Sequence, residues 1–227
     1  MDAKTYDSAL ATFNKHLDDA KDAKPGVEWR AGGRRTKAYP NKEDESWWRV
    51  EGPQLVHNYA VWRDAYPNMK IWRTPQGIPA IELALNLEIS KGVYLKCFID
   101  RVFEDVQTGD LIIVDLKTGK TPTNSLQLAI YRLAIFDQFG IDIPRGAFWM
   151  ARDGALDTIH NLNILPIETV RRWCVDVYDQ IHAGKYVPNL SQACGYCDVR
   201  NHCYAWNPAL TPDSYMALPI VERETSE

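Results

Sequence analysis

The segment at residues 111–117, LIIVDLK, restricts the fold of this chain more than any other stretch. An apolar run with a charged end is typical of a strand buried on both faces, so its sheet must be covered on both sides. Strand-like segments precede it at residues 79–89 and 92–104, and a further hairpin is expected over residues 145–165. Helical periodicity covers residues 4–22, 45–65, 124–139 and 168–183. This order predicts an α/β fold with a mixed β-sheet flanked by helices.

The sequence VQTG at residues 106–109 is a polar turn that fixes the register of a hairpin between the strands on either side of it. If the strands pair symmetrically about this turn, Asp100 lies directly opposite Asp115, with Cβ atoms about 5 Å apart. Lys117 follows Asp115 by two residues and therefore lies on the same face. A slip of one residue would separate these side chains, so the prediction depends on the register.

Two facing carboxylates repel each other, so a cation is expected between Asp100 and Asp115. Mg²⁺ and Mn²⁺ are the ions that suit carboxylate ligands. With Lys117 beside it to orient a water or stabilise developing charge, such an ion would make a site for phosphodiester hydrolysis. The other interpretation is a pair of aspartates hydrogen-bonded at the rim of the sheet. Gln127 and Tyr131 share one face of the following helix and would hold a phosphate or orient the lysine.

The composition excludes several classes of protein. The 227 residues are 45% apolar and 25% charged, which is ordinary for a soluble globular chain. No apolar run approaches the roughly 18 residues of a membrane helix, and the charged N-terminus has no signal-peptide core, so we expect a cytoplasmic protein without a membrane partner. The net charge of −4 argues against a surface that coats nucleic acid, so any contact with DNA must be local.

A basic segment at residues 24–46 supplies one candidate for such a local contact. Its cations are Arg30, Arg34, Arg35, Lys37 and Lys42, with Trp29 and Tyr39 between them. Its proline, glycine and charge content predicts a surface loop. The functional interpretation is a phosphate-contacting arm with aromatic rings that stack on bases.

Three cysteines lie within ten residues near the end of the chain, at Cys194, Cys197 and Cys203. An odd total of five cysteines in a reducing compartment favours metal binding over disulfides. Structural zinc sites and cubane iron–sulfur sites usually have four protein ligands, so a fourth ligand has to be found. For zinc it would be His202 or another residue, such as Cys174 if the last helix folds back.

Three sequence motifs carry a family resemblance. FIDRV, VDLKTG and QLAIY resemble three consecutive motifs of RecB-like nucleases in the PD-(D/E)XK superfamily, over roughly residues 79–205. The Cys-x2-Cys-x5-Cys spacing is similar to the iron–sulfur branch, which includes CRISPR-associated RecB-like exonucleases, their phage relatives and the AddB nuclease domain. The resemblance implies a restriction-endonuclease-like fold and a metal-dependent nuclease. Its substrate would be DNA ends or single strands, with a [4Fe-4S] cluster and a helicase, recombination or CRISPR partner.

The resemblance also implies roles for individual residues. Asp100, Asp115 and the carbonyl of Leu116 would bind Mg²⁺ or Mn²⁺, and Lys117 would be the catalytic lysine. Glu82, in the preceding strand, matches a frequent acidic position and would support the metal.

Gln127 and Tyr131 would form the family's fourth motif. Three regions are implied, which together make one compact domain: an N-terminal helical region with the basic loop at 1–78, the nuclease core at 79–184, and the cysteine segment and tail at 185–227.

Three departures from the family pattern bear on these expectations. Cys97 stands where the family usually has glycine, and it is expected to be a buried thiol. The family's Gly-x3-His has only the longer Gly52 to His57 as a counterpart, so His57 is either a displaced metal ligand or an exposed helix residue. No cysteine precedes Cys97 to act as the first cluster ligand. One hypothesis is that this chain lacks a leading segment, which would leave the cluster incomplete or absent.

Two other functions remain open from the sequence. A nuclease fold without the family's histidine would bind DNA or a partner but not cleave. A carboxylate–metal site would also serve a hydrolase that acts on RNA or nucleotides.

Overall fold

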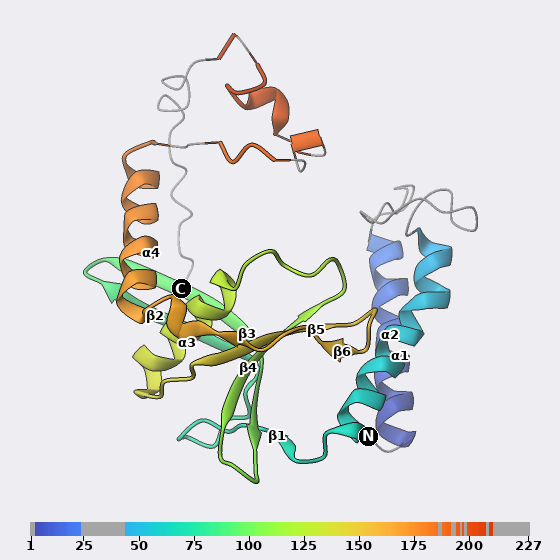
Figure 1. The fold of residues 1–227 in the computed structure, drawn as a ribbon. Helices are drawn as coiled ribbons and strands as arrows, with labels where there is room; N and C mark the ends of the chain where they lie inside the picture. The colour runs from blue at the N-terminus through green and yellow to red at the C-terminus, as the bar shows by residue number, and fades with distance from the viewer. Residues whose placement is uncertain are drawn as a thin grey trace.

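The computed structural model describes residues 3–23, 44–185, 188–191, 194, 195, 197, 199–207, 209 and 210. It contains a curled mixed sheet with helices on both sides (Figure 1). The helices are α1 (Ala3–Ala23), α2 (Glu45–Ala65), α3 (Leu126–Phe139) and α4 (Ile167–His182), with short 3-10 helices η1 (Leu162–Ile164) and η3 (Arg200–His202). The strands are β1 (Met69–Ile71), β2 (Ile81–Ser90), β3 (Val93–Asp105), β4 (Leu111–Lys117), β5 (Arg145–Met150), β6 (Ala155–Leu156) and β7 (His160–Asn161). The predicted mixed α/β architecture is therefore confirmed.

The long strand β3 organises the sheet. It pairs antiparallel with β2 and β1 along one edge and with β4 along the other. β4 pairs in parallel with β5, which is possible because α3 carries the chain across the sheet between them. β5 then pairs antiparallel with β6 and β7.

The register predicted for the central hairpin is confirmed. Arg101 pairs with Val114, and the pairs that follow continue this register down to the turn. The N–H of Asp105 donates to the carbonyl of Asp110 at 2.9 Å, which closes the turn. Gly109 has φ +75°, a conformation that favours glycine. The strand positions on both sides of the turn are therefore those that bring Asp100 and Asp115 to the same end of the hairpin.

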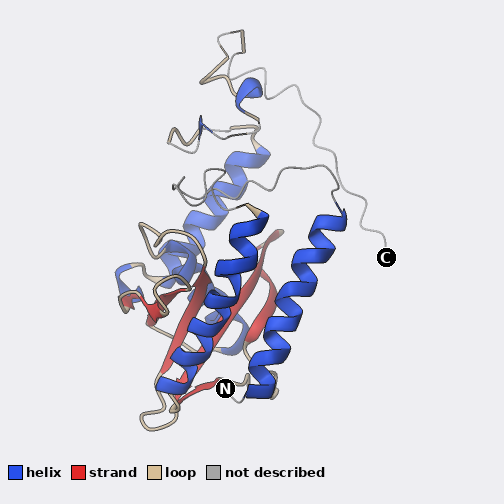
Figure 2. Cartoon of the chain, turned by 90° about the vertical axis from the view of Figure 1, so that its right-hand side faces the viewer, coloured by secondary structure: helices blue, strands red, loops and turns tan. Residues whose placement is uncertain are grey.

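Both faces of β4 are buried, as its apolar run predicts. Ile113 belongs to a core with α3 and α4, whereas Val114 belongs to a second core with Trp62 of α2. Figures 1 and 2 show α1 and α2 side by side along one side of the sheet, opposite α3 and α4. The last residues of β4 thus lie between two helical layers.

The hairpin expected over residues 145–165 is shorter than predicted. Its return strand is interrupted, because β6 and β7 have two residues each and η1 follows. Asp157 explains the interruption, since its carboxylate accepts the N–H of Phe148 at 2.8 Å in place of a ladder bond and also contacts His160 at 3.0 Å. β1 was not predicted, and its three residues are too few for an alternating pattern to be recognised.

Helix α3 ends as predicted at Gly140. This residue has φ +69°, and its N–H donates to the carbonyl of Phe136 at 2.8 Å. The basic loop predicted as a phosphate-contacting arm lies almost entirely outside the described residues. Among the described residues, no helix is both long and apolar enough to cross a membrane.

Gly52 allows α1 and α2 to approach closely, because a Cβ atom there would lie 2.1 Å from Cζ of Phe13. Gly52→Ala is expected to lower the free energy of unfolding by about 1–3 kcal/mol, since the overpacking outweighs the better helix propensity of alanine. Urea unfolding followed by circular dichroism measures this change. The matched control is Gly119→Ala, where a Cβ meets nothing within 4 Å. Equal stability of the two variants would contradict the close approach.

Candidate active site

The candidate site lies where β3 and β4 separate. The ladder between them runs from Glu104–Leu111 to Arg101–Val114. Beyond this last pair, a side chain replaces the backbone acceptor of β3: Oδ2 of Asp100 accepts the N–H of Leu116 at 2.7 Å. The two predicted metal-binding aspartates are therefore brought to one end of the hairpin.

The backbone around Asp100 is irregular. Ile99 and Val102 pack in the same core although they are three residues apart, so the strand's period of two is interrupted between them. On β2 the neighbouring Glu82 has φ +47°, the left-handed conformation that a residue with a side chain rarely adopts. Such irregularities re-aim side chains and are frequent beside active sites. Here the irregularity lies at the position from which Asp100 reaches Leu116.

Asp115 is buried, with 1% of its surface exposed, and its two carboxylate oxygens have different surroundings. Oδ1 accepts hydrogen bonds from Gln127 Nε2 at 2.7 Å and from the Tyr131 hydroxyl at 3.3 Å. Oδ2 is buried and faces Lys117 Nζ, which lies 2.5 Å away as an ion pair. Burial raises the pKa of Asp115, the ion pair with Lys117 opposes this, and the charge of Asp100 adds to it. The carboxylate is thus poised to accept a further cation.

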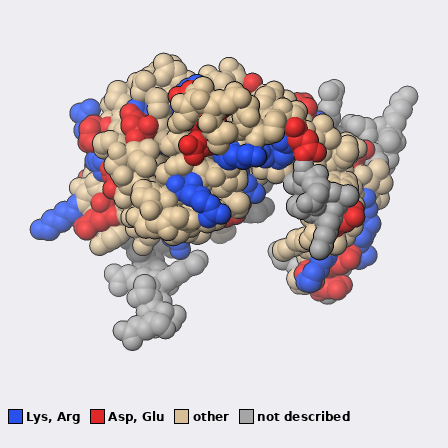
Figure 3. Space-filling model, turned by 90° about the horizontal axis from the view of Figure 1, so that it is seen from below, with Lys and Arg blue, Asp and Glu red and all other residues tan. Residues whose placement is uncertain are grey.

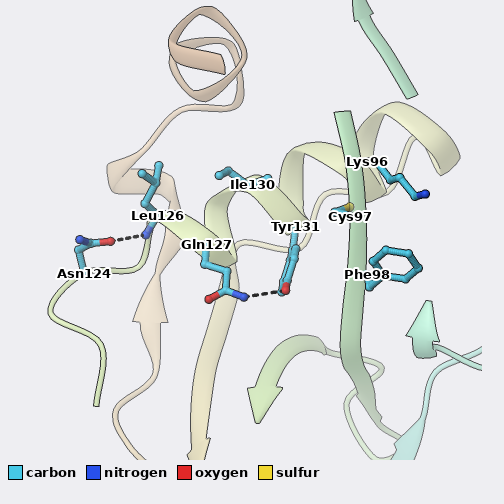
Figure 4. A pocket seen from close by; sticks show the side chains of 8 residues that line it. All are labelled: Lys96, Cys97, Phe98, Asn124, Leu126, Gln127, Ile130 and Tyr131. Atoms are coloured by element: carbon cyan, nitrogen blue, oxygen red, sulfur yellow. Dashed lines mark hydrogen bonds between the residues drawn. The ribbon is translucent and has the colours of Figure 1, made fainter. Parts of the chain in front are cut away.

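Helix α3 supplies the groups that hold the lysine and the aspartate in place. Gln127 accepts from Lys117 Nζ at 3.0 Å through Oε1, while its Nε2 donates to Asp115 and to the Tyr131 hydroxyl at 2.7 Å. Figure 4 shows the Gln127–Tyr131 contact. Burial raises the pKa of Tyr131 to about 12, so its hydroxyl keeps the proton that it donates to Asp115. The two predicted helix residues therefore join the predicted strand residues in one network.

The donors at this site fit a small, hard cation. Asp115 and Asp100 each provide carboxylate oxygens, and the Oδ2 of Asp115 already faces the Lys117 ammonium. The carbonyl of Lys117 bonds to Ala151 on the β5 side, so the carbonyl of the preceding residue, Leu116, faces the β3 side like its own N–H. Within the described residues no three His, Cys, Asp or Glu side chains gather to bind a metal. An ion here would thus need water or substrate oxygens as well, which is usual for Mg²⁺.

Glu82 and His57 are not brought into this network. The carboxylate of Glu82 is 64% exposed and lies 3.3 Å from Arg101 Nη1. His57 is on the exposed face of α2, where its ring packs edge-on against Tyr6 with 5.8 Å between ring centroids. In the described part of the chain, no hydrogen bond or ion pair joins either residue to Asp100 or Asp115. The described contacts of His57 are those of a helix-packing residue.

The cysteine segment lies beyond the C-terminal end of α4 and apart from the sheet (Figure 1). Cys194, Cys197 and Cys203 are free thiols, and the N–H of Ser191 contacts Cys194 Sγ at 3.5 Å. As placed, the described side chains of this segment do not form a metal-binding group of three. The cluster stays a prediction from the spacing of the cysteines.

Of the two remaining cysteines, Cys97 behaves as predicted, and Cys174 is not near the cysteine segment as a fourth ligand would be. Cys97 is buried, and burial raises the pKa of its thiol to about 11. Cys174 packs between α3 and the large core rather than against the cysteine segment.

Arg152 is a cationic residue near the site that sequence reasoning missed. Its Nε donates to the carbonyl of Thr118 at 2.6 Å, and its guanidinium lies 4.9 Å from the ring centroid of Trp47. Arg152 follows β5 just as Thr118 follows β4, and parallel strands end at the same edge of a sheet. The sequence signal was a cation at the end of the apolar segment 145–152, but it could be used only with knowledge of the parallel pairing.

The sequence profile of the PD-(D/E)XK nuclease superfamily matches residues 8–204. The chain belongs to this superfamily. Two phage proteins, both named "Gene 69 protein", are similar to it. The one from Mycobacterium phage D29 is 33% identical over 82% of this chain and 75% of its own length, and the one from Mycobacterium phage L5 is 30% identical over 88% and 81%. As a PD-(D/E)XK protein, the chain carries the pattern of the superfamily's name at Asp100 and at Asp115-Leu116-Lys117, with isoleucine in place of the proline.

Proposed function

We propose that the chain is a metal-dependent deoxyribonuclease that hydrolyses phosphodiester bonds at Asp100, Asp115 and Lys117. The observation that carries this proposal is that Asp100, the buried Asp115 and Lys117 meet at one end of the β3–β4 hairpin, where two carboxylates lie beside one ammonium and a divalent cation would balance their charge. The superfamily match supports phosphodiester cleavage, and the oxygen donors support Mg²⁺ or Mn²⁺.

The side chains would divide the work of hydrolysis. A divalent ion bound by the two aspartates and the Leu116 carbonyl would polarise the phosphate and lower the pKa of an attacking water. Lys117 is held between Asp115 and Gln127, and its ammonium would orient that water or stabilise charge on the phosphate. Tyr131 and Gln127 hold the Oδ1 side of Asp115, so Oδ2 keeps its direction.

We further propose an exonuclease that acts on DNA ends or single strands, as the resemblance to RecB-like enzymes suggests. The face in Figure 3 mixes Lys and Arg with Asp and Glu instead of forming one basic surface, so a DNA contact on that face would be local. An iron–sulfur cluster in the cysteine segment remains a separate proposal, which iron analysis and the visible spectrum of anaerobically purified protein would test.

The proposed activity is tested with end-labelled linear single-stranded DNA, linear duplex and closed circular DNA, in Mg²⁺, Mn²⁺ or EDTA. We expect cleavage of the linear substrates with either ion and none with EDTA. Asp100→Asn is expected to reduce the rate at least about a hundredfold, since a metal ligand and the Leu116 contact are both weakened. Asp176→Asn, an exposed aspartate on α4, is the matched control.

Other outcomes of this experiment distinguish the remaining functions. If a linear RNA added to the same assay is cleaved with metal while none of the DNA substrates is, the proposed substrate is wrong. DNA binding without cleavage in any metal would favour a catalytically impaired nuclease fold. Cleavage of closed circular DNA would indicate an endonuclease and contradict the proposed exonuclease.

A further inference from the structure

A recess of about 650 Å³ adjoins the candidate active site along β3. Gln127 and Tyr131, which contact Asp115, also line the recess, so the recess and the candidate site share two wall residues. Its other walls include Ile130 of α3, and Lys96 and Phe98 of β3. A volume of this size is in the range of small-ligand pockets.

The recess exists because one edge of β3 is bare. β4 pairs with β3 only from Arg101 to Glu104, and in the described structure no strand pairs with the same edge before Arg101. Residues from both faces of β3 therefore reach the recess: Cys97 faces α3, while Lys96 and Phe98 project from the other side of the strand (Figure 4). The recess thus wraps around an exposed strand edge that leads directly to Asp100.

Phe98 has an unusually open ring for an aromatic residue in a strand. It is 52% exposed, and its directly opposed neighbour on β2 is Ala84, which is too small to cover the ring. Lys96 Nζ lies 5.7 Å from the centroid of this ring. An open aromatic face beside a cation is the combination that stacks a nucleobase and neutralises its phosphate.

We infer that this recess holds one unpaired nucleobase next to the scissile phosphate, stacked on Phe98, with Lys96 contacting a neighbouring phosphate. Phe98 precedes Asp100 by two residues, about 7 Å along a strand, so a base on the ring lies close to a phosphate at the two aspartates. A base inside a duplex has both faces covered by its neighbours and cannot take this position without leaving the stack. The inference rests on the proposed function, and it makes Phe98 a determinant of preference for single-stranded DNA.

Binding measurements test this subsite independently of catalysis. A fluorescein-labelled single strand and the corresponding duplex are titrated in EDTA, and Kd is followed by fluorescence anisotropy. Phe98→Ala is expected to weaken single-strand binding on the order of tenfold and to leave duplex binding nearly unchanged. Phe98→Trp is expected to retain binding, because it keeps an aromatic face. Lys96→Gln is expected to reduce the slope of log Kd against log[salt] by about 0.7, the value for one phosphate contact to a single strand.

Tyr94→Ala is the matched control, since Tyr94 is an aromatic residue on the same face of β3, is 63% exposed and does not line the recess. Its single-strand affinity is expected to equal that of the unmodified protein. Equal losses in Phe98→Ala and Tyr94→Ala, or equal losses on single strand and duplex, would overturn the subsite. Thermal melting checks that the variants fold.

The subsite and the proposed function can fail separately. If the protein cleaves DNA with metal but Phe98→Ala binds single strands as tightly as the unmodified protein, the proposed nuclease is supported and the subsite is wrong. If single-strand binding depends on Phe98 but the protein cleaves no substrate, the subsite is supported and the proposed nuclease activity is wrong. Absence of DNA binding by the unmodified protein would overturn both.

Discussion

Replacing Asp115 by asparagine is expected to abolish DNA cleavage and to remove the stabilisation of the folded protein by Mn²⁺. A metal that binds only the folded state stabilises it by about 2.7 kcal/mol when its concentration is a hundred times Kd, which raises Tm by about 5–10 °C in a chain of this size. Asp115→Asn keeps an acceptor for Gln127 and Tyr131 but removes the charged Oδ2. The response to metal should therefore be lost without loss of the fold.

Thermal melting of the unmodified protein and the variant, with Mn²⁺ and with EDTA, measures this effect. Asp176→Asn, on the exposed face of α4, controls for the loss of one negative charge. Glu82→Gln is a second comparison, and we expect it to keep most of the response, because Glu82 is exposed and paired with Arg101. An unchanged rise of Tm in Asp115→Asn would show that the metal binds elsewhere.

Lys117→Ala is expected to leave the Mn²⁺ stabilisation in place and to reduce cleavage by about 10²–10⁴-fold. The reason for the difference is that both aspartates and the Leu116 carbonyl remain, while the ammonium that faces Asp115 and Gln127 is lost. The rate is measured by single-turnover cleavage of linear DNA with saturating metal.

Chemical rescue makes the lysine prediction specific. A small alkylammonium ion fits the space that Lys117→Ala leaves, so ethylammonium is expected to restore part of the rate. The matched control is Lys91→Ala, in the exposed turn between β2 and β3, which should cleave normally and respond to no amine. Full activity in Lys117→Ala would exclude Lys117 from the reaction.

The central part of the site could be predicted from sequence because a hairpin register is a local property. The four-residue turn and the apolar pattern of LIIVDLK were sufficient to bring Asp100 and Asp115 to the same end of the hairpin, and the spacing of Gln127 and Tyr131 placed both on one face of α3. The structure adds the unequal surroundings of the two Asp115 oxygens, which depend on how α3 packs over β4.

The features that the sequence did not predict depend on contacts between distant segments. The parallel pairing of β4 with β5, which brings Arg152 to the carbonyl of Thr118, depends on where α3 returns the chain. The left-handed conformation of Glu82 has no local cause in its sequence, and it occurs on β2 between the pairs Ile81–Arg101 and Leu83–Ile99 with β3. The exposure of the Phe98 ring depends on the β3–β4 ladder stopping at Arg101, and the hairpin register alone does not predict where the ladder stops.

The central strand–turn–strand–helix unit also has a consequence for the order of events in folding. All the side chains of the candidate site come from one continuous stretch, Asp100 to Tyr131, that makes β4 and parts of β3 and α3. Loops that close within such a stretch cost little chain entropy, whereas the docking of α2 on β5 joins segments far apart in sequence. We therefore expect Asp100 and Asp115 to meet early during folding, before α1 and α2 cover the other face of the sheet.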